Sequence, residues 1–155
     1  MYTTADYTFS QTTALAARPG LALYNAALAR GWLKRLWAVL SGQKCTLRQL
    51  PANTNPDTAD SRIRHTVREI AVRDIIGSED RRGDFDLDFN PLREATRDRW
   101  LSVYHAWVSG ISLPPIELVR GPDGYYVRDG HHRLSVARAV VIDATLAQVG
   151  AAGAA

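Results

Sequence analysis

The chain has 155 residues, of which 46% are hydrophobic and 23% charged, and its formal net charge is +3. This length predicts one domain, and this composition excludes a disordered chain, a collagen-like repeat and a disulfide-rich miniprotein. Cys45 is the single cysteine, so no intrachain disulfide forms. The sequence has no apolar run of about 18 residues and no basic, apolar leader at its N-terminus. We therefore expect a cytoplasmic protein without a membrane span or a secretory signal.

The charge is unevenly distributed along the chain. No acidic residue occurs between Tyr7 and Pro56, a stretch whose basic residues give +6, whereas residues 57–155 hold 13 arginines against 15 carboxylates. A basic segment that carries tryptophans is suited to a phosphate backbone, an anionic membrane surface or an acidic protein partner. The favoured alternative is a helix packed on the core with its basic face in solvent, because arginines and lysines are common on protein surfaces.

The N-terminal third predicts one helix. Residues 1–13 are polar and predict no regular element. Apolar residues at three- and four-residue steps predict a helix from near Gly20 to the Ser41–Gly42 stop. The turn-rich stretch 50–60 predicts a linker, which separates a basic helical extension (1–60) from a domain at 61–155.

The remaining elements predict an α+β domain with a small mixed sheet. Alternation predicts a strand at 66–72, followed by a turn at 74–78 and an acidic loop at 79–89. A helix is expected from Pro91 to Val108, since proline suits the first helical position. The C-terminal third predicts a hairpin of strands at 116–119 and 125–128, a helix at 131–140 and a final strand at 141–149.

The junction between the second hairpin strand and the following helix is the clearest candidate site. Gly130 lets the chain turn directly into a helix, whose first N–H groups and positive dipole end favour an anion. Arg133, one turn into the helix, adds a bidentate phosphate contact, while His131 and His132 donate hydrogen bonds or titrate near neutral pH. Asp129 either holds magnesium or fixes an arginine. An aspartate cap with a paired surface arginine explains the same residues equally well.

The acidic loop is a second candidate. It contains Asp80, Asp84, Asp86 and Asp88, and closely spaced carboxylates bind magnesium. A solvated polar loop with internal Arg–Asp pairs is the favoured alternative.

Two stretches carry a family resemblance. Residues 113–136, with Pro-Pro-Ile and Asp-Gly-His-His-Arg elements, resemble the ParB/sulfiredoxin superfamily, in particular its small bacterial ParB-like nuclease domain proteins. Residues 72–89, with Ile-Ile-Gly-Ser, Asp-Arg and Asp-Phe-Asp elements, are similar to the same proteins. The resemblance implies a compact ParB/sulfiredoxin-like domain that binds a nucleotide, either CTP or ATP/ADP, together with Mg²⁺. His131 stands where sulfiredoxins have their cysteine, which excludes sulfiredoxin chemistry.

The resemblance also implies roles for individual residues. The nucleotide contacts that it implies are Gly77, Ser78, Arg81, Asp129, Gly130, His131, His132 and Arg133. The catalytic candidates are His131, His132, Glu79 and Asp80, and the metal ligands would be Asp80 and Asp129.

Three functions stay open at this point. The first is nucleotide binding with NTP hydrolysis or phosphoryl transfer. The second is a non-enzymatic module in which nucleotide is a switch and the basic N-terminal helix docks DNA or a protein partner. A nuclease ranks third, because the sequence shows no clustered His/Asp/Glu metal site of nuclease type. Each of these three functions is compatible with a homodimer.

Overall fold

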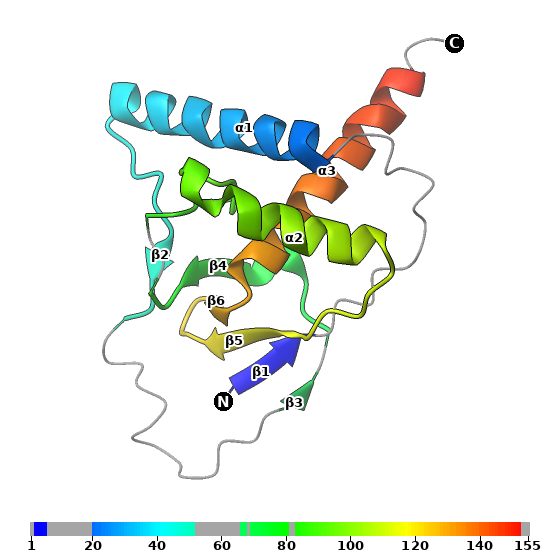
Figure 1. Cartoon of the computed structure of the whole chain (residues 1–155). Coiled ribbons are helices and arrows are strands. Elements are labelled where there is room, and N and C mark those ends of the chain that lie inside the picture. Colours follow the sequence, from blue (N-terminus) through cyan, green and yellow to red (C-terminus); the bar gives the residue numbers. More distant parts are fainter. Residues whose placement is uncertain (1, 6–19, 52–65, 68, 81–82, 153–155) are drawn as a thin grey trace.

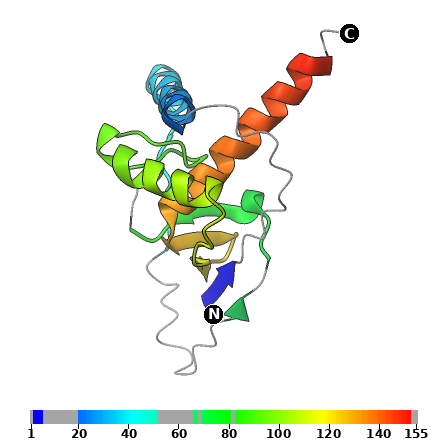
Figure 2. The same ribbon diagram turned by 45° about the vertical axis from the view of Figure 1, so that its right-hand side comes forward.

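The protein is built on one mixed sheet with its helices gathered on one side (Figures 1 and 2). The computed structural model describes residues 2–5, 20–51, 66–67, 69–80 and 83–152. The strands are β1 (Tyr2–Ala5), β2 (Arg48–Gln49), β3 (Thr66–Val67), β4 (Ile75–Ser78), β5 (Ile116–Arg120) and β6 (Tyr125–Asp129). The helices are α1 (Gly20–Ser41), α2 (Arg97–Val108) and α3 (His131–Ala152), with short 3-10 turns η3 (Val72–Asp74) and η4 (Glu94–Thr96). The predicted α+β class is confirmed.

The strand order brings the ends of three parallel strands to one edge of the sheet. The order is β2-β4-β6-β5-β1-β3, in which β4 pairs in parallel with both β2 and β6, while β5 runs antiparallel to β6 and β1. Three adjacent parallel strands therefore end at the same edge. The chain leaves β6 at this edge and starts α3 directly, so the start of α3 lies beside the end of β4.

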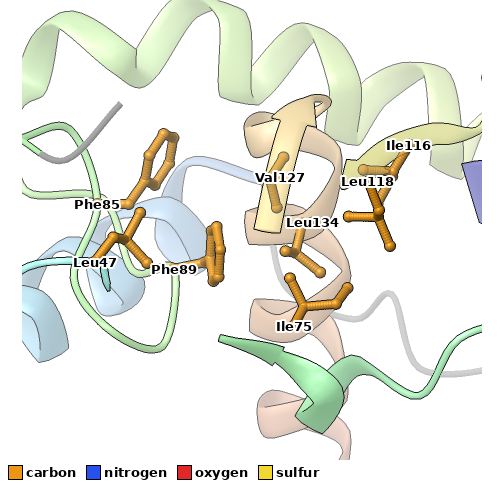
Figure 3. Packing of buried hydrophobic residues seen from close by; sticks show 8 residues of the cluster. All are labelled: Leu47, Ile75, Phe85, Phe89, Ile116, Leu118, Val127 and Leu134. Atoms are coloured by element: carbon orange, nitrogen blue, oxygen red, sulfur yellow. The ribbon is translucent and has the colours of Figure 1, made fainter. Parts of the chain in front are cut away.

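Two apolar clusters hold these layers together. The first lies between the sheet, α3 and the segment 84–92 (Figure 3), and its buried members are Leu47, Ile75, Phe85, Phe89, Ile116, Leu118, Val127 and Leu134. The second joins the three helices, and its buried members are Leu23, Tyr24, Ala27, Trp100, Tyr104, Val136 and Ala139. Helix α3 contributes to both clusters and is the element that connects the sheet to α1 and α2.

The final strand predicted at 141–149 is wrong, because α3 continues without interruption to Ala152. The β-branched run from Val140 to Ile142 favoured a strand on propensity alone. No glycine or proline separates Arg138 from Asp143, however, and an established helix extends at little cost because each added residue gains a backbone hydrogen bond.

The strand predicted at 66–72 is confirmed only at Thr66–Val67, and the turn predicted at 74–78 is wrong. The first stretch ends in the η3 turn at Val72–Asp74, and Ile75–Ser78 form β4 instead of a turn. Gly77 caused the error, since glycine commonly marks a turn. Here a Cβ on Gly77 would collide with the carbonyl oxygen of Arg48 and the ring of Tyr126. The glycine is therefore required by close approach of the neighbouring strands.

The helix predicted from Pro91 begins later, at Arg97, after the η4 turn. Pro91 pairs with Phe85 in an isolated antiparallel bridge, and the Leu92 N–H donates to the Asp84 carbonyl at 2.9 Å. These long-range backbone pairs hold the segment 84–92 as a tight loop. Pro91 is thus part of the loop and not the first residue of a helix.

The helix at 20–41 and the hairpin of β5 and β6 are confirmed. The predicted irregular N-terminus is wrong at Tyr2–Ala5, which pair with β5 as β1. Most of the predicted linker, 52–60, lies outside the described residues. The division at residue 60 stays a prediction, although α1 shares the helical core cluster with α2 and α3. None of the helices among the described residues combines the length and apolar character that a membrane span requires.

Candidate functional site

The start of α3 is shaped by a glycine in a backbone conformation that other residues rarely adopt. Gly130 has a φ of +99°, and a Cβ there would lie 3.0 Å from Ile116 Cγ2 and 3.1 Å from the guanidinium of Arg133. The Leu134 N–H donates to the Gly130 carbonyl at 3.0 Å, so helical bonding begins within the first turn. The positive end of a 22-residue helix therefore lies at the sheet edge where β4 and β6 end.

Arg133 is held firmly at this helix start. Its Nη1 donates to the carbonyl oxygens of Pro114 and Pro115, the latter at 2.7 Å, and its Nη2 donates to Asp129 Oδ2 at 2.6 Å. Its side chain is only 15% exposed, whereas that of Asp129 is 63% exposed. The arrangement agrees with the interpretation that Asp129 fixes an arginine.

His131 faces the protein interior. Its Nε2 lies 2.7 Å from the Ser78 hydroxyl, and both residues are buried. The ring also stacks on Phe85, with centroids 6.1 Å apart. Both side chains are shielded from solvent, and this Ser–His pair ties the start of α3 to the end of β4. His132 is half-buried and packs edge-on against the same phenylalanine ring at 5.3 Å.

Glu79 follows β4 and is fixed by an arginine of β6. Arg128 donates to both carboxylate oxygens of Glu79, at 2.6 and 2.9 Å. The hydrogen bonds and the positive charge of Arg128 lower the pKa of Glu79, against the opposing effect of partial burial. Glu79 is therefore charged at neutral pH, which suits a base or a positioning group better than an acid.

The other predicted site residues lie in different surroundings. Asp80 is exposed, and Arg81 lies outside the described residues. Gly77 is buried within the sheet, where it serves strand packing. Among the described residues, no three His, Cys, Asp or Glu side chains are grouped as a metal site would require.

The acidic loop is not the solvated loop that the sequence favoured, because its centre is buried. Phe85, Asp86 and Phe89 are almost fully inaccessible, and Phe89 adopts a φ of +59° in the turn. Asp86 accepts hydrogen bonds from the N–H groups of Asp88 and Asn90 and from the Asn90 side chain, at 2.8–2.9 Å. Burial raises the pKa of Asp86, although the two hydrogen bonds from Asn90 oppose the shift. Its role is to hold the turn.

The internal Arg–Asp pairs predicted for this loop involve Arg81 and Arg82, which lie outside the described residues, and the aspartates pair instead with cations from other segments. Asp84 lies 3.5 Å from Arg93, while Asp88 pairs with Lys34 of α1 and lies 3.6 Å from Arg138 of α3. Asp88 thus connects two helices to the loop. Its carboxylate is occupied by these cations and is not directed at the start of α3.

Arg138 is the structural residue that sequence reasoning missed. Its Nη2 donates to the carbonyl oxygens of Val72 and Ile75 at 2.9 and 3.3 Å, and its guanidinium lies 5.2 Å from the Phe89 ring centroid. A single cation therefore joins α3, β4 and the loop. The available signal was an arginine among the apolar residues of α3, a position that is rarely charged unless it is paired.

A cavity of about 470 Å³ lies elsewhere, between the end of α1 and the loop. It is lined by Lys34, Trp37, Ala38, Ser41, Gln43, Lys44, Cys45, Asp86, Leu87 and Asp88. Two lysines face two aspartates in this lining, so the cavity has no excess of one charge. None of its lining residues belongs to the site predicted at the start of α3.

Comparison with models of protein families, with curated proteins and with solved structures finds no match for this chain. The function is therefore argued from the geometry of the residues themselves.

Proposed function

We propose that the protein binds a nucleotide at the sheet edge formed by the ends of β4 and β6, with the phosphates at the start of α3. The observation that carries this proposal is the sharp turn at Gly130, which places the positive end of α3 beside the ends of two parallel strands. Open sheets of parallel strands bind ligands outside their carboxyl ends, and helix N-termini favour phosphate. This arrangement is the one expected of a ParB/sulfiredoxin-like domain.

Arg133 is the proposed phosphate ligand. Its Nη1 is fixed by the Pro114 and Pro115 carbonyls, so that Nη2, now bound to Asp129, is the group available for exchange. A phosphate would take the place of the Asp129 carboxylate on Nη2. The displaced carboxylate, with the exposed Asp80, would then be available to a magnesium ion bound to the same phosphates.

The histidines divide their roles in this proposal. The His131 ring is engaged with Ser78 inside the protein, which leaves it a positioning role at the helix start. His132 is the better candidate for a hydrogen bond to the phosphates or for proton transfer during hydrolysis or phosphoryl transfer. The charged Glu79, fixed by Arg128, would orient a water molecule or an acceptor near the end of β4.

Calorimetric titration with CTP, ATP and ADP, each with and without magnesium, tests the proposal. We expect one nucleotide to bind, and Arg133→Gln to weaken its binding by about 1.5–3 kcal/mol through loss of a charged hydrogen bond. Without magnesium, Asp129→Asn should bind at least as tightly as the native protein, because a competing carboxylate is removed. Arg99→Gln, which removes an exposed arginine from α2, is the matched control and should leave the affinity unchanged.

Two results would overturn the proposal. One is that none of the three nucleotides binds, and the other is that Arg133→Gln and Arg99→Gln bind equally well. Because Arg133 also bonds two backbone carbonyls, thermal unfolding of Arg133→Gln must first show a folded protein.

The switch and nuclease alternatives share this phosphate site and differ in the fate of the bound molecule. Release of inorganic phosphate at saturating nucleotide and magnesium supports an NTPase, whereas binding without turnover supports a switch. Plasmid cleavage that is lost in Arg133→Gln supports a nuclease, and cleavage that persists in this variant indicates a contaminant.

A further inference from the structure

Helix α1 exposes an apolar face that the other described residues leave uncovered. Seven of the twelve large hydrophobic side chains that are exposed among the described residues belong to this helix, namely Leu21, Trp32, Leu33, Leu36, Trp37, Val39 and Leu40. Trp37, Val39 and Leu40 are each more than 70% exposed. We refer to Trp32, Leu33, Leu36, Trp37, Val39 and Leu40 as the outer face of α1.

The outer face is distinct from the face that packs on the core. The buried residues of α1 include Ala27, which packs with α2 and α3, and Gly31 and Ala38, which lie toward the segment 84–92. A Cβ on Gly31 would lie 2.7 Å from the Pro91 carbonyl oxygen, so this side is in close contact with the body of the protein. Figures 1 and 2 show α1 at the periphery of the molecule, with the sheet on the far side of α2. The outer face therefore has no packing role within the described structure.

Cations border the outer face and are not balanced by acids of the same segment. Residues 20–51 contain no aspartate or glutamate. Lys34 is bound to Asp88, but Arg35 and Lys44 are exposed and form no ion pair with any residue that the structure describes. The long stems of such side chains pack along apolar surface while their charged heads stay in a polar layer.

The combination of exposed apolar side chains and bordering cations fits one of three kinds of partner better than the other two. A nucleic-acid backbone requires cations at the centre of the contact, whereas the centre here is leucine and tryptophan. A second copy of the same face would bring Arg35 and Lys44 close to the same cations of its partner, with no acid on either helix. An anionic lipid surface complements both features, since leucine and tryptophan enter the headgroup boundary and cations meet the lipid charge.

We propose that the outer face of α1 docks on an anionic membrane surface, with the helix axis parallel to the bilayer plane. Trp32, Trp37 and Leu40 enter the interface, and Arg35 and Lys44 bind acidic headgroups. The start of α3 takes no part in this contact, so the docking surface and the proposed nucleotide site are independent.

Flotation with lipid vesicles tests the proposal. The full chain should float with vesicles of phosphatidylcholine mixed with phosphatidylserine and only weakly with pure phosphatidylcholine. Tryptophan emission should shift to shorter wavelength on binding, because Trp32 and Trp37 leave water while Trp100 is already buried.

Two double variants separate the apolar and charged contributions. Trp37→Ser with Leu40→Ser should weaken partition into the vesicles by at least roughly tenfold, because these two side chains supply apolar area whose removal from water drives binding. Arg35→Gln with Lys44→Gln should weaken it by roughly thirtyfold on the mixed vesicles, as expected for two cations near an acidic surface. Val108→Ser with Ile111→Ser, which alters two exposed apolar side chains outside α1, and Arg99→Gln with Arg120→Gln should both bind like the native chain.

The proposal is overturned if the native chain does not float with the mixed vesicles, or if the control variants lose as much binding as the α1 variants. Equal binding to both kinds of vesicle contradicts the anionic component. Self-association that is lost in Trp37→Ser with Leu40→Ser, without vesicle binding, assigns the face to a second copy. Binding of a DNA duplex that is lost in Arg35→Gln with Lys44→Gln, without vesicle binding, assigns it to nucleic acid.

Discussion

The start of α3 and the outer side of α1 use charged and apolar residues in opposite ways. Around α3, each arginine meets a carboxylate within the fold, as Arg128 meets Glu79 and Arg133 meets Asp129, and the aromatic rings are buried. On α1, leucines and tryptophans face solvent and Arg35 has no acid beside it on the helix. Among the described residues, the arginines of the first region are paired with acids of the fold, while the second region keeps its apolar side chains and the charge of Arg35 exposed.

The two regions also differ in what their aromatic residues contribute. Trp100 is fully buried between α1 and α3, lies 5.4 Å from the Tyr24 ring and donates to the Ser135 hydroxyl at 3.0 Å. Trp37 is 72% exposed. The same residue type therefore supports the fold in one region and is available for binding in the other, a difference that mutation can measure directly.

The largest expected effect on stability comes from replacing Trp100 by alanine, compared with the same replacement of Trp37. Trp100→Ala should lower the free energy of unfolding by about 3–5 kcal/mol, because it opens a cavity in the helical core and removes a buried hydrogen bond. Trp37→Ala should change it by no more than about 0.5 kcal/mol. Urea denaturation of both variants measures the difference, and equal losses would show that the outer face of α1 is part of the folded core.

The next effect concerns the turn that starts α3. Gly130→Ala should cost about 1–3 kcal/mol, because φ is +99° and the added methyl group meets Ile116 and Arg133. Gly110→Ala is the control, since its φ of +71° is similarly strained but nothing lies within 4 Å of the added Cβ. A smaller loss for Gly110→Ala isolates the contribution of steric contact at the site. Equal losses would mean that backbone strain alone explains the need for Gly130.

The smallest expected effect is the pH dependence of the Glu79–Arg128 pair. The folded state lowers the pKa of Glu79 below its ordinary value of 4.5, so its contribution is present above that value and is lost as pH falls through the lowered pKa. Glu79→Gln should lower the free energy of unfolding by about 1 kcal/mol at neutral pH, and this deficit should disappear in acid. Urea denaturation at a series of pH values measures it, and a deficit independent of pH would contradict an ionic origin.

The pH dependence of stability that Asp86 contributes has the opposite sign. Burial raises its pKa above the ordinary value of 3.8, so the folded state binds a proton more readily than the unfolded chain. Its contribution to stability therefore rises as pH falls toward that value. Asp86→Asn should remove this slope in the same titration, whereas a variant that keeps it would assign the slope to another carboxylate.

Several features were predictable from the sequence because their causes are local. The apolar repeat fixed α1 at Gly20–Ser41, and the Gly-Pro-Asp-Gly turn fixed the β5–β6 hairpin. The glycine before His131 placed the start of α3 correctly, since a strand that turns at once into a helix needs a positive φ. The candidate phosphate element was thus recognisable from the residues themselves.

Other features depended on contacts between distant residues. In the sequence, Asp86 is one of several acidic residues of the loop. Only its burial, together with Phe85 and Phe89, distinguishes it from the others. The sequence predicts that the Arg133 side chain is free to bind phosphate. In the structure, it donates hydrogen bonds to the Pro114 and Pro115 carbonyls and to Asp129. Neither outcome is encoded in the spacing of neighbouring residues.

By itself, the sequence determined the α+β class, the helix α1, the hairpin and the glycine turn into α3, because backbone preference and hydrophobic periodicity act over a few residues. The tertiary structure alone decided that 74–78 is a strand, that α3 continues through 141–149 and that the outer side of α1 is apolar. Each of these depends on which surface a segment meets. Parallel strand pairing brings Gly77 against Arg48 and Tyr126, and packing on α2 and α3 selects which side of an all-round apolar helix is left to solvent.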